Sequence, residues 1–137
     1  MIFFYELYLS CEVYKERTQK EHRKIIEKAI IDLYNELHLK RNMIVRIKRT
    51  EGKNQSTIYC GTHEMNEDWD HEIEINTLMF FMVTPISMFR TLCHEMYHAF
   101  QTEHFMTISE KNAEKVGRRL FKKFYPSFRN SMKEVWF

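Results

Sequence analysis

The feature that most constrains this 137-residue chain is a pair of histidines, His94 and His98, four positions apart with Glu95 beside the first. A threonine and a proline at 84–85 are typical of a helix start, because the hydroxyl caps the first turn and the proline there costs no hydrogen bond. We expect one helix from 85 to about 103. Residues four apart share a helix face, so the fold must aim both imidazoles at one point.

The composition is that of a chain that can bury a core. It has 44% hydrophobic and 15% aromatic residues against three glycines and two prolines. This excludes collagen-like, linker and low-complexity proteins, and the length predicts a single domain over residues 1–137. Lys and Arg number 21 and Asp and Glu 19, so the net charge of +2 identifies no partner.

Cysteine spacing and the apolar runs bear on location. Cys11, Cys60 and Cys93 are an odd number at wide spacing, which is not a disulfide framework. No apolar run approaches the roughly 20 residues that cross a bilayer. We therefore expect a cytoplasmic protein without a membrane partner.

Hydrophobic periodicity predicts an α+β chain. The segment 2–9 suits either a strand or the start of a buried helix, and a helical stripe recurs within 13–39. Residues 43–49 and 57–60 read as a probable hairpin, and 71–76 alternates like a half-buried, possibly edge, strand. A capping box at 107–110, Thr-Ile-Ser-Glu, predicts a last helix to about 124, with Pro126 at or just after its end.

The histidine pair and its glutamate suit metal chemistry. Two imidazoles on one helix face can bind one ion, while Glu95, about 100° round the helix, can meet a water bound to that ion. Zinc lowers the pKa of such a water, and a neighbouring carboxylate can take its proton. Catalytic zinc usually has three protein ligands, so a third must be found. The alternative is that these are ordinary helix residues.

The run Leu-Cys-His94-Glu95-Met-Tyr-His98-Ala-Phe-Gln, after a strand that reads His-Glu-Ile-Glu-Ile-Asn, resembles the zincin metallopeptidases of the SprT-like or minimal gluzincin group. The resemblance implies zinc-dependent hydrolysis of a protein or peptide substrate, with Glu95 as general base. It also implies a minimal zincin fold: an N-terminal helix, a small mixed sheet, the motif helix and a C-terminal helix. In that fold the strand before the motif is the sheet edge along which substrate lies, here Glu72, Ile73, Glu74 and Ile75.

Two residues compete for the third ligand position. Ser109-Glu110-Lys-Asn-Ala-Glu114 resembles the gluzincin arrangement, which implies that Glu110 binds zinc and Glu114 orients a histidine. His104 has the metzincin spacing, and SprT-like proteins use a third histidine. However, Gln101 replaces the metzincin glycine, so the helix should continue and carry His104 away. The simpler alternatives are a capping box closed by Glu110, a Glu114–Arg118 pair and a helix end capped by His104.

Three further features invite a functional reading. Tyr125 and His104 are candidate donors to the oxyanion of a peptidase. Lys111, Lys115, Arg118 and Lys122 form one stripe of the last helix, which is either a solvated face or a nucleic-acid contact. The stripe motivates two alternatives, a nucleic-acid-binding or adaptor module without turnover and a DNA-recruited SprT-like protease. Cys60 and His63 resemble half a zinc site, but no second pair accompanies them.

Overall fold

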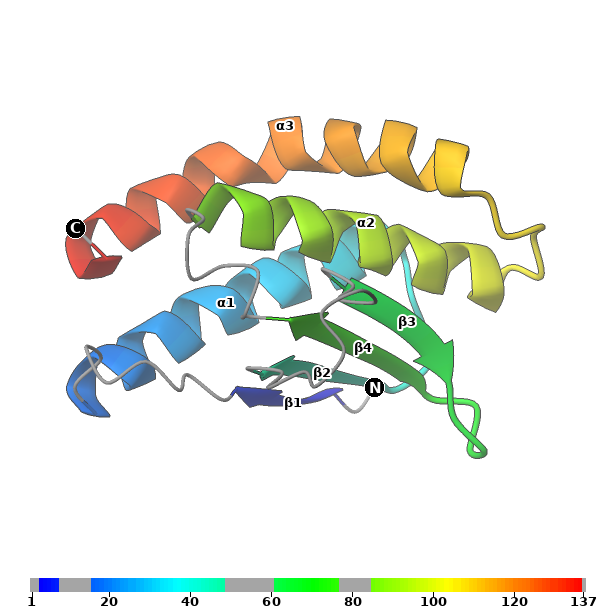
Figure 1. The fold of residues 1–137 in the computed structure, drawn as a ribbon, viewed down its shortest axis with the longest axis horizontal. Helices are drawn as coiled ribbons and strands as arrows, with labels where there is room; N and C mark the ends of the chain where they lie inside the picture. The colour runs from blue at the N-terminus through cyan, green and yellow to red at the C-terminus, as the bar shows by residue number, and fades with distance from the viewer. Residues whose placement is uncertain (1–2, 8–15, 49–60, 77–84, 137) are drawn as a thin grey trace, which may run out of the picture.

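The computed structural model describes residues 3–7, 16–48, 61–76 and 85–136. Three helices and four strands make an α+β fold, as predicted. In Figure 1 the helices lie on one side of the strands, with α3 farthest from them. The elements in chain order are β1 (Phe3–Leu7), α1 (Glu16–Glu36), β2 (Met43–Lys48), β3 (Gly61–Met65), β4 (His71–Asn76), α2 (Pro85–Glu103) and α3 (Glu110–Trp136).

The four strands form one mixed sheet in the order β1-β2-β4-β3. β1, β2 and β4 are parallel, and β3 is antiparallel to β4. The predicted edge position of 71–76 is therefore wrong: β4, which carries Glu72, Ile73, Glu74 and Ile75, lies between β2 and β3. The physical reason is local, since a short turn at 66–70 folds β3 back onto the edge of β4.

The expected hairpin of 43–49 with 57–60 also needs revision. Residues 57–60 lie outside the described residues, and the described strand that follows them, β3, pairs with β4. The two neighbours of β2 are β1 and β4. The predicted alternation of buried and polar side chains in β4 is confirmed, since His71, Ile73 and Ile75 are all fully buried.

α2 is the central helix of the fold. It packs on β3 and β4 with one side, and α3 covers α2 and α1. The apolar residues of α2 fill the space between these layers, because residues three and four apart share a face. The fully or almost fully buried ones are Phe89, Leu92, Cys93, Met96 and Ala99.

The first two helices follow the sequence prediction more closely than α3 does. α1 lies within the predicted stripe, and α2 begins at Pro85 and ends at Glu103. α3, by contrast, continues through Pro126 to Trp136. Buried Phe128, stacked on Phe89 at 4.7 Å between ring centroids, packs the helix beyond the proline. This packing offsets the stability lost with the one backbone hydrogen bond that a proline removes. None of the described helices combines the length and apolar character of a membrane span.

Candidate metal centre

The middle of α2 and the first residue of α3 bring three metal-binding side chains together. Nε2 of His94 lies 2.9 Å from Glu110 Oε2, and Nε2 of His98 lies 3.0 Å from Glu110 Oε1. The two Nε2 atoms are 3.2 Å apart. Each residue offers one ligand atom, and these three atoms all lie within 4.8 Å of one another, so they could hold a metal ion. The predicted ligand set of His94, His98 and Glu110 is thus brought to one point.

A buried glutamine determines which nitrogen of His98 faces this point. The side-chain amide of Gln101 is fully buried, and its N–H donates to the Ser109 carbonyl at 3.2 Å. Its oxygen therefore faces Nδ1 of His98, 2.9 Å away, and accepts a hydrogen bond from the Nδ1–H group. In the neutral imidazole of His98, Nε2 is therefore the unprotonated nitrogen, and its lone pair points toward Glu110.

The arrangement of donors and acceptors at this point favours a cation. The lone pair of His98 faces a carboxylate oxygen and the Nε2 atom of His94 at hydrogen-bonding distance. A proton on Nε2 of His94 can be donated either to Glu110 or to His98. In both cases the contact between Nε2 of His98 and Oε1 of Glu110 still joins two acceptors. Imidazole nitrogen and carboxylate oxygen are ordinary zinc ligands. The chemistry of the donor set therefore fits a divalent metal such as zinc.

The loop between α2 and α3 fixes the position of Glu110. α2 closes with Phe105 in a left-handed conformation, while the N–H of Met106 bonds to the Gln101 carbonyl at 2.8 Å. Ser109 then caps α3, because its hydroxyl accepts the N–H of Asn112 at 3.1 Å. The predicted capping box at 107–110 is thus shifted: Ser109, two residues later than expected, is the cap.

Glu95 lies beside the ligands and is only 7% exposed. Burial raises the pKa of its carboxyl, whereas His94 and His98 lower it and Glu110 raises it. Among the described residues, none forms a hydrogen bond or ion pair with it. A buried carboxylate that makes no hydrogen bond within the described part of the chain can bind a water molecule, as a general base must.

Gly61, the first residue of β3, permits the close approach of the sheet to α2 at this point. A Cβ atom there would meet Thr91 Cγ2 at 2.6 Å and Glu95 Cγ at 3.1 Å. A larger residue would have to displace the Thr91 side chain and press on that of Glu95, so glycine fits here best. The sequence reading missed this role of Gly61.

Two cavities meet at the metal centre. One, of about 800 Å³, lies between α2, α3 and Gly61. The other, of about 390 Å³, is lined by β3, the end of α2 and Ile108. Both include Glu95 and Glu110 in their walls. The strand that lines the smaller cavity is β3, the edge strand of the sheet. The residues predicted for that role, Glu72 to Ile75, line neither cavity.

Three other predicted site residues do not have the contacts that their predicted roles require. Glu114 pairs with Arg118 at 3.3 Å, so the orienting role expected of Glu114 falls to Gln101. His104 follows the end of α2, and its Nδ1 bonds the Phe100 carbonyl at 3.0 Å, which makes it a helix cap. The ring of Tyr125 packs against Phe89 and Phe121 and lines neither cavity. It is therefore unsuited to the oxyanion.

The stripe of Lys111, Lys115, Arg118 and Lys122 is exposed along α3, as the periodicity predicted. Its four members are not equivalent. Arg118 and Lys122 line the larger cavity, whereas the other two do not. Contact of this stripe with nucleic acid stays a prediction.

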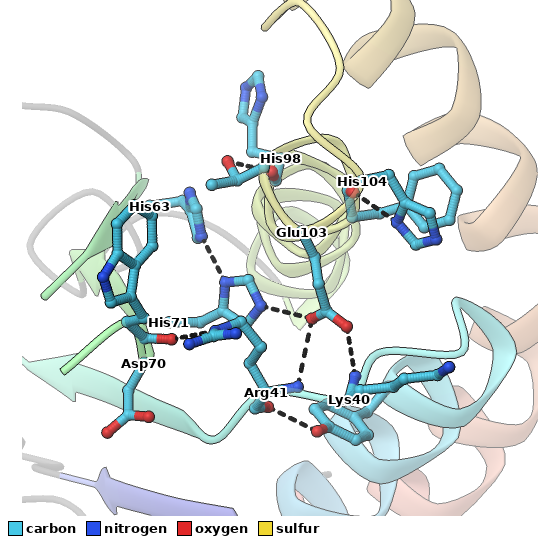
Figure 2. A network of polar contacts seen from close by, with 12 residues as sticks. Lys40, Arg41, His63, Asp70, His71, His98, Glu103 and His104 are labelled. Carbon is cyan, nitrogen blue, oxygen red and sulfur yellow. Dashed lines mark hydrogen bonds and ion pairs between the residues drawn. The ribbon is translucent and has the colours of Figure 1, made fainter.

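A second set of two histidines and a glutamate lies on the sheet side of α2 (Figure 2). His63 Nε2 is 3.0 Å from His71 Nδ1, and His71 Nε2 is 2.8 Å from Glu103 Oε2. The backbone N–H groups of Lys40 and Arg41 also donate to the Glu103 carboxylate. In Figure 2 the His98 ring extends away from this network. The network joins β3, β4 and the end of α2 and gives His63 a partner, whereas Cys60, its expected partner in half a zinc site, lies outside the described residues.

Comparisons of this chain with models of protein families, with curated proteins and with solved structures find no match.

Proposed function

We propose that this chain is a zinc-dependent metallopeptidase in which His94, His98 and Glu110 hold the metal. The observation that carries the proposal is the convergence of these three side chains beside Glu95, a buried carboxylate with no partner among the described residues. A ligand set of two histidines and a glutamate is of the gluzincin kind. His104, the third histidine that an SprT-like set would need, is bonded to a backbone carbonyl instead.

The reaction would be shared between the metal and the chain's own residues. Zinc, when bound, supplies a Lewis acid that polarises a peptide carbonyl and lowers the pKa of water. Glu95 takes the proton of the attacking water and then donates it to the leaving amine. Gln101 keeps Nδ1 of His98 protonated, so that Nε2 is available to the metal. β3 is the edge strand of the sheet that the described residues form, and it can pair with the backbone of an extended substrate.

Metal analysis combined with one conservative variant tests this proposal. We expect the purified wild type to contain zinc and to cleave quenched fluorescent peptides or unfolded casein. Glu95→Gln should keep the metal, because Glu95 is not a ligand, and lose about 10²- to 10⁴-fold in activity with the general base. A zinc-free wild type, or cleavage unchanged by Glu95→Gln, would contradict the proposal.

A further inference from the structure

The larger cavity beside the metal centre has an unusual set of side chains in its walls. Its volume of about 800 Å³ is that of a typical ligand site. It reaches the metal centre directly, since His94, Glu95 and Glu110 form part of its lining. A group bound in this cavity would therefore lie next to the reacting atoms.

Three cations from two helices face this cavity. Arg90 comes from α2, one turn before His94, and Arg118 and Lys122 come from α3, four residues apart on one face. Only the last two belong to the basic stripe. Packing of α2 against α3 thus collects positive charge that no single segment of the sequence contains.

Of the three acidic residues in the same walls, Glu110 and Glu114 have partners, and Glu95 is the buried carboxylate beside the two histidines. Glu110 contacts both histidine ligands, and Glu114 pairs with Arg118 at 3.3 Å. No described residue offers an ion pair to Arg90 or Lys122; the guanidinium of Arg90 lies over the Phe121 ring, 5.1 Å from its centroid. Two cations therefore remain available to an incoming anion.

We infer that this cavity is a substrate subsite for an acidic side chain, aspartate or glutamate, next to the bond that is cleaved. The inference rests on the proposed function and specifies its substrate class. A single carboxylate can be held by Arg90 and Lys122 through charge-assisted hydrogen bonds, while the backbone of its peptide follows the edge of β3.

A peptide fits these observations better than nucleic acid does. Nucleic acid is bound by surfaces that neutralise many successive phosphates. Lys111 and Lys115, the part of the stripe that would extend such a surface, lie outside the cavity, and the carboxylates of Glu110 and Glu114 border it. The charge is arranged for one anionic group beside the metal centre.

Binding of matched peptides to a turnover-deficient protein tests the inference. Zinc-loaded Glu95→Gln would be titrated with fluorescent peptides in which one glutamate is moved along a neutral sequence, each paired with its glutamine counterpart. We expect one glutamate position to bind about tenfold tighter than glutamine, a value discounted for the exposure of the cations. Adding Arg90→Gln and Lys122→Gln should abolish this preference.

The control is a second pair of changes, Lys111→Gln with Lys115→Gln, both on α3, which removes equal charge outside the cavity. It should keep the preference for glutamate. Equal binding of glutamate and glutamine peptides, or equal loss of preference in both double variants, would overturn the inference. So would a DNA duplex that displaces the peptide from the wild-type cavity and not from the Arg90 and Lys122 variant.

Cleavage by the protein with Glu95 intact separates this inference from the proposed function. Cleavage of glutamate and glutamine peptides at equal rates, with equal binding, would overturn the acidic subsite and leave the peptidase. A glutamate preference in binding, without cleavage of any peptide by the zinc-loaded wild type, would support the anionic cavity and overturn the peptidase.

Discussion

Two sets of His, His and Glu lie close to each other at α2, one toward α3 and the other toward the sheet, and their atoms are arranged in different ways. In the network of His63, His71 and Glu103, the contacts form a chain in which each N–H meets an acceptor. At the metal centre, Nε2 of His98 faces the carboxylate of Glu110 with its lone pair. The same residue types thus make a saturated structural network in one place and an acceptor cluster suited to a cation in the other.

Exposure differs between the two sets as well. His71 is fully buried, and the side chain of Glu103 is 9% exposed, so their hydrogen bonds hold strands and helix together. The Glu110 side chain is 77% exposed and lies in the walls of two cavities. The two sets thus contain the same residue types but differ in what their atoms face and in their access to solvent.

The largest effect that separates the two sets is expected from removing one histidine of each. His98→Ala should abolish zinc binding at stoichiometric concentrations together with peptidase activity, because two ligands hold zinc poorly. His71→Ala should keep one metal site but lower the free energy of unfolding by about 3 kcal/mol, since it leaves buried polar groups unpaired. Metal analysis and chemical denaturation measure the two outcomes.

The contrast would fail if the effects were exchanged. Loss of zinc from folded His71→Ala, with zinc retained by His98→Ala, would mean that the network is the metal site.

Gln101→Leu sharpens the comparison at the metal centre alone. Leucine keeps much of the volume but cannot accept the Nδ1 proton of His98, so the imidazole is free to change tautomer. We expect zinc affinity to fall about 10- to 100-fold, as for other residues that orient a metal ligand. Competition with a chromogenic chelator measures the zinc affinity. Gln101→Glu, which keeps an acceptor for Nδ1 of His98, should lose less zinc affinity.

The pH dependence of stability of the metal-free protein should come partly from the structural network. Burial, then the nearby His71 and His98, lower the pKa of His63 to about 4, and burial lowers the pKa of His71. An unfolded histidine has a pKa of about 6.5. Above that pH both states are neutral and the contribution of His63 is complete. As the pH falls from 6.5 toward 4, the unfolded chain takes up the proton first, so stability decreases.

Each such histidine contributes at most about 1.4 kcal/mol per pH unit in this range. Denaturation midpoints between pH 7 and 4.5 should therefore fall less steeply in His63→Gln than in the wild type. The exposed His104→Gln is the control and should follow the wild-type curve. A His63→Gln curve parallel to the wild type would contradict this account.

The smallest expected effect concerns the loop that joins the ligands. Phe105 has a φ of 54° and is 90% exposed, so it has a left-handed backbone without compensating packing. Glycine adopts this conformation without steric cost. Phe105→Gly should raise the free energy of unfolding by up to about 1 kcal/mol and leave zinc affinity unchanged. Destabilisation would show that the phenyl ring has a contact role.

Much of this arrangement could be predicted from local sequence. The start of α2 followed from a threonine and a proline, its continuation past Gln101 from the absence of glycine there, and helical spacing placed His94 and His98 on one face. Glu110 was proposed from a resemblance and lies with them. Local patterns suffice here because the candidate ligands come from one helix and from the first turn of the next.

Features that depend on tertiary packing could not be read in this way. The edge position of β3 depends on pairing between strands, and Pro126 lies inside α3 because Phe128 packs beyond it. The role of Gln101 could have been found, since it lies three residues after His98 on the same helix face. In the sequence, Gln101 stands out only because it replaces the metzincin glycine, and the resemblance assigns the orientation of a histidine to Glu114.

Zinc content of three proteins tests the central claim most directly. Purified wild type, His104→Ala and Glu110→Ala would be loaded with zinc, dialysed and measured by elemental analysis. The account predicts about one zinc ion per chain in wild type and His104→Ala and loss of the metal in Glu110→Ala. Retention by Glu110→Ala with loss from His104→Ala would contradict it.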